Sequence, residues 1–186
     1  DRGTFCSANW GAIKYNPDGT LNSSKIITTI TTNPTHQPVV DDSGNVYFIS
    51  ESSQDVRKYN STFDLVDSAS SLFGDVSNPS AVAIDKNRSI LYLLSDGPDT
   101  SNINENITIH KLNSALDVLN ETTVANVTTA SSISLGNLGG NNNGDIAFNN
   151  NSGDIYVAAT TTSTSVNRSI LILRFNENLT LLQNVS

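Results

Sequence analysis

The pattern in this chain most able to support covalent chemistry is Asn-x-Ser/Thr, the acceptor for N-linked glycosylation. It occurs ten times in 186 residues, against about 6 expected by chance for this content of Asn, Ser and Thr. The ten acceptors are Asn22, Asn60, Asn87, Asn106, Asn120, Asn126, Asn150, Asn167, Asn178 and Asn184. All lie in or beside expected turns, connections and strand ends, so they are predicted to be exposed, as glycosylation requires. The pattern predicts covalent N-glycans and an extracellular or cell-surface location.

The histidines and the single cysteine give weaker indications of chemistry. His36 and His110 have no second His or Cys at ligand spacing, so a zinc site is not predicted. A Ser-His-Asp triad stays open by composition, but no nucleophile elbow or oxyanion loop marks one. Cys6 takes a position that is apolar in other copies of the repeat described below, and is predicted to be a small buried hydrophobe.

Two acidic loops could suggest calcium. They are 41–45 (DDSGN) and 96–99 (DGPD). Neither has the alternating carboxylates and distal Glu of an EF-hand loop, and Asx-type turns explain both. The sequence therefore predicts no catalytic, cofactor-binding or metal site, and no cofactor.

Charge and composition restrict the partners. Eighteen acidic residues against ten basic ones give a net charge of −8, and no basic cluster is present to bind nucleic acid. No apolar run approaches the roughly 20 residues of a membrane span, so direct membrane insertion is not predicted. Methionine is absent, and we expect a processed product or an excerpt of something longer.

A repeat organises the chain. Four segments share a basic residue, a large apolar residue and Asn, with a further apolar residue a few places on. They are Lys14-Tyr15-Asn16, Lys58-Tyr59-Asn60, Lys111-Leu112-Asn113 and Arg174-Phe175-Asn176, followed by Leu21, Leu65, Val118 and Leu181. Each predicts a strand, a tight turn and the start of a second strand.

A second shared hairpin precedes three of these segments. Its copies run over 39–50, 83–95 and 147–159. Together the two hairpins give four short antiparallel strands per unit, which is typical of a β-propeller blade. Residues 4–7 align with 47–50, so the first unit is expected to lack its first strand. This gives fifteen strands in all.

The amino-acid sequence of the repeat resembles that of NHL-type and related propellers, with Gly44-Asn45-Val46-Tyr47 followed by Lys58-Tyr59-Asn60. The resemblance implies an all-β, propeller-like fold of about three complete blades plus a partial one. We predict one domain over 1–186, with a partial blade at 1–33 and blades at 34–78, 79–143 and 144–186. A β-sandwich is the alternative fold.

Specific strands and core positions follow from the repeat. Strands are expected over most of 45–50, 56–60, 81–85, 90–95, 107–112, 146–149, 154–160 and 170–175, with almost no helix. Long loops are expected at 95–106, 120–143 and 159–169. The residues predicted to be buried in register are Phe48, Val56, Leu93, Ile109 and Val157.

These features predict a non-enzymatic structural glycoprotein of a surface coat or filament. An open ring edge favours head-to-tail self-association, with residues 1–8 or 178–186 at the contact. One alternative is a propeller that binds a ligand or protein through its longer loops. A second is a propeller enzyme of lactonase or lyase type, a group whose fold the sequence distantly resembles. Those enzymes bind a metal through acidic and Asn residues around the central channel, and we find no matching residues here.

Overall fold

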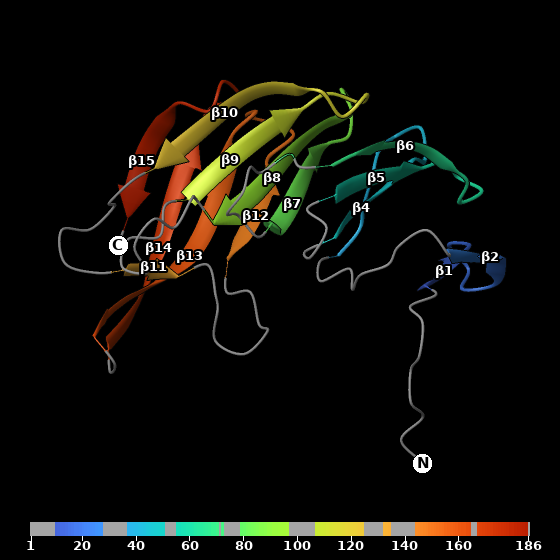
Figure 1. Cartoon of the computed structure of the whole chain (residues 1–186), viewed down its shortest axis with the longest axis horizontal. Helices are drawn as coiled ribbons and strands as arrows, with labels where there is room; N and C mark the ends of the chain where they lie inside the picture. The colour runs from blue at the N-terminus through green and yellow to red at the C-terminus, as the bar shows by residue number, and fades with distance from the viewer. Residues whose placement is uncertain are drawn as a thin grey trace, which may run out of the picture.

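The computed structural model of the chain consists of antiparallel strands joined by short turns (Figure 1). It describes residues 10–27, 37–50, 55–70, 72, 79–96, 107–124, 132–134, 144–164 and 167–185. Within these ranges no residue is helical. The fold is therefore all-β, as the repeat predicts.

The strands form four sheets, which we number in chain order. The first sheet pairs β1 (Trp10–Tyr15) with β2 (Leu21–Ile27). The second contains β3 (Val39–Val40), β4 (Val46–Ser50), β5 (Asp55–Tyr59) and β6 (Leu65–Ala69). The third contains β7 (Pro79–Asp85), β8 (Ile90–Asp96), β9 (Ile107–Leu112) and β10 (Val118–Val124). The fourth contains β12 (Asp145–Phe148), β13 (Ile155–Thr164), β14 (Asn167–Phe175) and β15 (Leu181–Val185), with β11 (Ser132–Ser134) on the far end of β13.

The second, third and fourth sheets repeat one propeller-like unit. In each, four consecutive strands pair antiparallel with their chain neighbours, from β3 to β6, from β7 to β10 and from β12 to β15. Successive side chains point to opposite sides of a strand, so a strand is apolar on one side where apolar and polar residues alternate and on both sides where they do not. The tight turns use residues that tolerate left-handed backbone, such as Gly44 (φ 79°) and Gly153 (φ 73°).

The core lies between successive sheets. We call the side of a sheet that packs on the next sheet its forward face, and the opposite side its rear face. Tyr47, Ile49 and Val56 on the forward face of the second sheet pack with the rear-face residues Leu93 and Leu116 of the third. A larger cluster joins the forward face of the third sheet to the rear face of the fourth in the same way. The third sheet thus buries both of its faces.

The expected strands are confirmed within about two residues except at 154–160 and 170–175, which are three to four residues longer in the structure, and two expected loops are wrong. The connection at 159–169 is mostly strand, because β13 continues to Thr164 and β14 starts at Asn167. The connection at 120–143 contains the end of β10 and the short strand β11. The Thr- and Ser-rich extension of β13 accounts for the first correction and for β11, because it pairs along Thr160–Thr162 on both sides, whereas the end of β10 pairs with β9. Residues 97–106 lie outside the described ranges.

The predicted core positions are confirmed with one correction. Val56, Leu93, Ile109 and Val157 are fully buried. Phe48 is only half-buried. It lies on the rear face of the second sheet, where among the described residues only Ala12 of the first sheet joins its apolar cluster.

No helix in the described part of the chain is long and apolar enough to cross a membrane.

Candidate functional site

Side chains that could do chemistry gather in three places, of which the first is a row across the third sheet. Ser95 (β8), His110 (β9) and Glu121 (β10) are neighbours across adjacent strands. Ser95 Oγ lies 3.3 Å from His110 Nε2, and Glu121 Oε2 lies 3.2 Å from His110 Nδ1. This is the order of groups in a Ser-His-acid hydrolase triad.

The row is closed off from solvent at Ser95 and His110. Ser95 is 0% exposed and His110 is 3% exposed, so no substrate carbonyl can reach the serine oxygen. Burial lowers the pKa of His110, and the Glu121 carboxylate only partly opposes this. The imidazole is therefore neutral at neutral pH and crosslinks three strands.

The second group consists of the acidic turns. Asp41 is 4% exposed and accepts hydrogen bonds from the Asn45 backbone N–H (2.8 Å), Asn45 Nδ2 (2.9 Å), the Tyr47 hydroxyl (3.0 Å) and the Ser89 hydroxyl (3.3 Å). Burial raises the pKa of Asp41, but these donors outweigh it and leave the pKa below its usual value. The predicted Asx-rich hairpin turn at 41–45 is confirmed. Among the described residues, no three His, Cys, Asp or Glu side chains converge as a metal site.

Three of the four Asn-led turns that follow the basic-apolar-Asn segments contribute a buried residue to the contacts between sheets. In these three turns the leading Asn side chain accepts backbone N–H groups two and four residues on. The fourth residue of each turn has a left-handed backbone: Phe63 (φ 60°), Leu116 (φ 60°) and Leu179 (φ 61°). All three are at least 93% buried. Sequence reasoning missed them, because it selected apolar residues two positions later, and Leu65, Val118 and Leu181 are exposed.

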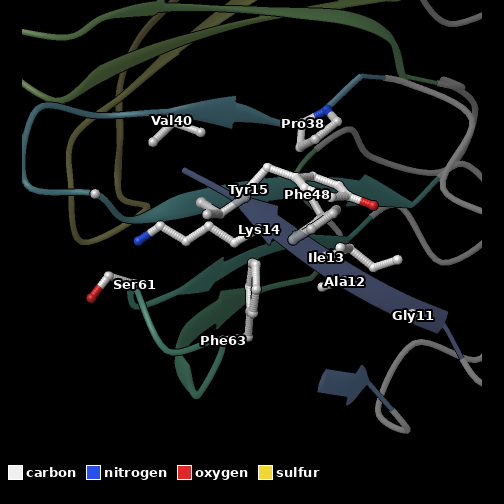
Figure 2. Close-up of a pocket in the computed structure, with 12 residues that line it drawn as sticks. Gly11, Ala12, Ile13, Lys14, Tyr15, Pro38, Val40, Phe48, Ser61 and Phe63 are labelled. Atoms are coloured by element: carbon white, nitrogen blue, oxygen red, sulfur yellow. The ribbon is translucent and has the colours of Figure 1, made fainter. Parts of the chain in front are cut away.

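The third group lines a cavity of about 510 Å³ between the first and second sheets. Its walls are mainly apolar and include Ala12, Tyr15, Phe48 and Phe63. Figure 2 shows Lys14 extending along it toward Ser61. It could hold an apolar molecule, with an ammonium group available for a negatively charged end.

The sequon asparagines fall on turns and outer strands. Side chains of six are exposed: Asn22, Asn87, Asn120, Asn150, Asn178 and Asn184. Asn60 is half-buried, and its side-chain oxygen accepts the backbone N–H groups of Thr62 and Asp64. Asn167 begins β14 beside the hairpin turn rather than lying in a long loop. Asn106 and Asn126 lie outside the described residues, as do Cys6, His36 and Asp99.

The comparisons with known proteins bear on the fold. No protein-family model matches the chain, and no curated protein matches it. Among solved structures it is similar to a protein of unknown function from Bacteroides caccae, with a TM-score of 0.52 and 13% sequence identity. The match covers 92% of this chain and 52% of that one, so the chain spans about half the length of that protein. At this identity the likeness shows a shared fold.

Proposed function

We propose that this chain is a non-enzymatic, N-glycosylated structural module of an extracellular coat or filament, and that it associates head to tail. The observation that carries the proposal is the exposure of the acceptor asparagines. Six of the seven whose side chains are described are exposed, and an acceptor must be accessible to be glycosylated. Within the same proposal, the Lys58-Tyr59-Asn60 and Gly44-Asn45-Val46-Tyr47 hairpins support an NHL-type propeller.

The polar clusters support a structural role over a catalytic one. The groups most like catalytic residues, Ser95 and His110, are buried inside the stack of sheets. Asp41 uses its carboxylate to hold its own turn and to contact Ser89 of the next sheet. On this proposal, these side chains hold turns and strands in place and connect one sheet to the next.

Mass spectrometry of the intact protein tests the glycoprotein assignment. We expect protein from its native source to exceed the polypeptide mass, with sugar on at least half of the ten sequons. A glycosidase that cleaves N-glycans should remove the excess. Asn87→Gln and Asn150→Gln should each remove the mass of one glycan, whereas Asn113→Gln, outside any sequon, should remove none. A native mass equal to that of the bare polypeptide would contradict the proposal.

The cavity favours a second candidate function, binding of an apolar ligand with a carboxylate end. Its mainly apolar walls suit an acyl chain, and Lys14 would pair with the carboxylate. A fluorescent fatty acid should bind to the wild-type protein. Val40→Trp, at a lining position, should weaken binding, whereas Val66→Trp, at an exposed position on β6, should not. Equal binding by both variants would exclude the cavity as the site.

A further inference from the structure

The last strand of the second, third and fourth sheets begins with two exposed apolar residues. These strands, β6, β10 and β15, each follow an Asn-led turn and lie at the end of their sheet. The pairs are Leu65-Val66, Val118-Leu119 and Leu181-Leu182, and every side chain in them is between 42% and 55% exposed. A single exposed apolar residue is ordinary, whereas adjacent ones that recur at one place in the repeat mark a contact surface.

The pair on the third sheet lies on an exposed strand edge. Both faces of this sheet are buried against its neighbours, so its outer strand β10 is what remains at the surface. Among the described strands β10 pairs only with β9, and its outer edge has no strand partner there. An apolar edge of this kind can pair with a strand of another molecule, and native proteins block such edges.

A glycosylation acceptor lies directly at this edge. Asn120 follows the Val118-Leu119 pair in β10 and is exposed, and Thr122 completes its acceptor pattern. The first sheet has an acceptor at nearly the same place. By register its Leu21 corresponds to the first residue of each pair, and the next residue is the sequon asparagine Asn22. The acceptor therefore recurs beside the outer apolar positions of two sheets.

The second sheet provides the contrast, because its outer strand β6 contains no sequon asparagine. By register Asp67 takes the place of Asn120. The nearest acceptor, Asn60, is half-buried and caps its own turn. A charge on an edge strand opposes pairing with another strand, and Asp67 supplies one on β6. On β10 the carboxylate of Glu121 is held by His110 at 3.2 Å, which leaves the edge to a different kind of cover.

A hydrogen bond holds the Asn120 side chain in place. We call the packed contact between two successive sheets a joint. Across the joint between the third and fourth sheets, Asn120 Nδ2 donates to the backbone oxygen of Asn178 at 3.0 Å. An asparagine amide has two N–H groups, and N-glycosylation replaces one and leaves the other to donate. Asn120 can thus carry a sugar and keep this bond, so that the sugar starts from a fixed point beside the apolar pair.

We infer that the N-glycan of Asn120 lies over Val118-Leu119 and covers the outer edge of β10. The C–H groups of the sugar ring pack on the apolar side chains and remove them from water, while its hydroxyl groups stay hydrated. The bulk of the glycan closes the edge to pairing with another strand. The inference rests on the proposed N-glycosylation and gives one of the glycans a defined contact surface on its own chain.

Hydroxyl-radical footprinting, read by mass spectrometry of peptides, measures how far solvent reaches each side chain. Two variants at Thr122 form a matched pair. Thr122→Ala removes the acceptor pattern but leaves Asn120 and its hydrogen bond, whereas Thr122→Ser keeps the pattern. In protein from the native source we expect labelling of Val118-Leu119 to be about twofold higher in the Ala variant, because the bulky glycan no longer covers the pair. Labelling of Leu65-Val66 should be the same in both variants.

Two controls separate this contact from other effects of sugar. Enzymatic removal of N-glycans from the wild type should raise the labelling of Val118-Leu119 without any substitution. Asn87→Gln, which removes an acceptor in the turn between β7 and β8, should leave it unchanged.

Three results would overturn the inference, and they differ in what they say about the proposed function. Equal labelling of Val118-Leu119 in the Ala and Ser variants, with sugar on Asn120 in the Ser variant, overturns the inference and leaves the glycoprotein assignment intact. A native Asn120 without sugar, in a protein glycosylated at other sequons, does the same. A native protein with no glycan on any sequon overturns both.

Discussion

Tyr47 and Tyr92 occupy the same position in successive sheets, yet their hydroxyl groups have different surroundings. Both side chains are 0% exposed and each ring lies under a lysine ammonium. The Tyr47 hydroxyl donates to the buried Asp41 carboxylate at 3.0 Å. The Tyr92 hydroxyl is buried with no hydrogen-bond partner in the described structure, and burial raises its pKa to about 12. Removing the Tyr47 hydroxyl should therefore lower the free energy of unfolding, whereas removing the Tyr92 hydroxyl should leave it unchanged or raise it.

Tyr47→Phe should destabilise the protein by about 1.5–3 kcal/mol, because a hydrogen bond to a charged group is lost in the interior. Tyr92→Phe should be neutral or stabilising by about 1 kcal/mol, since it removes an unpaired buried hydroxyl. The two variants should thus differ by about 1.5–4 kcal/mol. At about 2–4 °C per kcal/mol for a chain of this size, their melting temperatures should differ by roughly 3–16 °C. The effects on the lysine–ring contacts largely cancel, because each variant loses only the hydroxyl group of a ring that lies under a lysine.

Circular dichroism during thermal and urea unfolding measures the difference, and pH gives a control. Hydrogen bonds hold the pKa of Asp41 below its usual 3.8 despite burial. The stability from these bonds is present above pH 3.8 and is lost as pH falls through the lower folded-state value. The deficit of Tyr47→Phe should therefore shrink in strong acid. Equal melting temperatures for the two variants at pH 7 would refute the assignment of the Tyr47–Asp41 bond.

Two further predictions concern the joints and the buried histidine. Leu116→Ala should destabilise the protein by about 2–5 kcal/mol, because Leu116 is 3% exposed in the core; Leu65→Ala, at a position 46% exposed, should change stability by less than about 1 kcal/mol, and urea unfolding compares the two. For His110, burial puts the folded-state pKa below 6.5, so its contribution is complete above pH 6.5 and is lost as pH falls toward the folded-state value. The midpoint of urea unfolding of the wild type should fall as pH falls over that range. In His110→Gln the midpoint should not show this part of the pH dependence.

The fold could be predicted from the sequence because the hairpin signals are local. Alternation in Val46-Tyr47-Phe48-Ile49 and the turn residues around Gly44 and Gly153 specify strands and tight turns without knowledge of their partners. The extended β13 was missed because the Thr- and Ser-rich stretch 160–164 has the composition of a loop. Threonine also favours strands, and here pairing on both sides decides the outcome.

The candidate site was less predictable because it depends on contacts between sheets. A leucine at φ 60° contradicts local turn chemistry, which favours Gly, Asn or Asp there. The conformation is stabilised by burial of Leu116 and Leu179 in the preceding joint and by the capping Asn side chains. The recurrence of Phe63, Leu116 and Leu179 three residues after the repeated Asn was the available signal. The row from Ser95 to Glu121 likewise requires the register of three strands.

Stacked sheets of this kind gain stability from their neighbours, so a sheet packed on one side only should be the least stable. The first sheet has two strands and contacts the second through Ala12 and the ion pair of Lys25 with Asp64, a surface pair of small value. Amide hydrogens of β1 and β2 should therefore exchange faster than those of β8 and β9, which lie inside the third sheet between two packed neighbours. Hydrogen exchange followed by mass spectrometry measures this difference. Equal protection of the two sheets would mean that packing between sheets does not set their local stability.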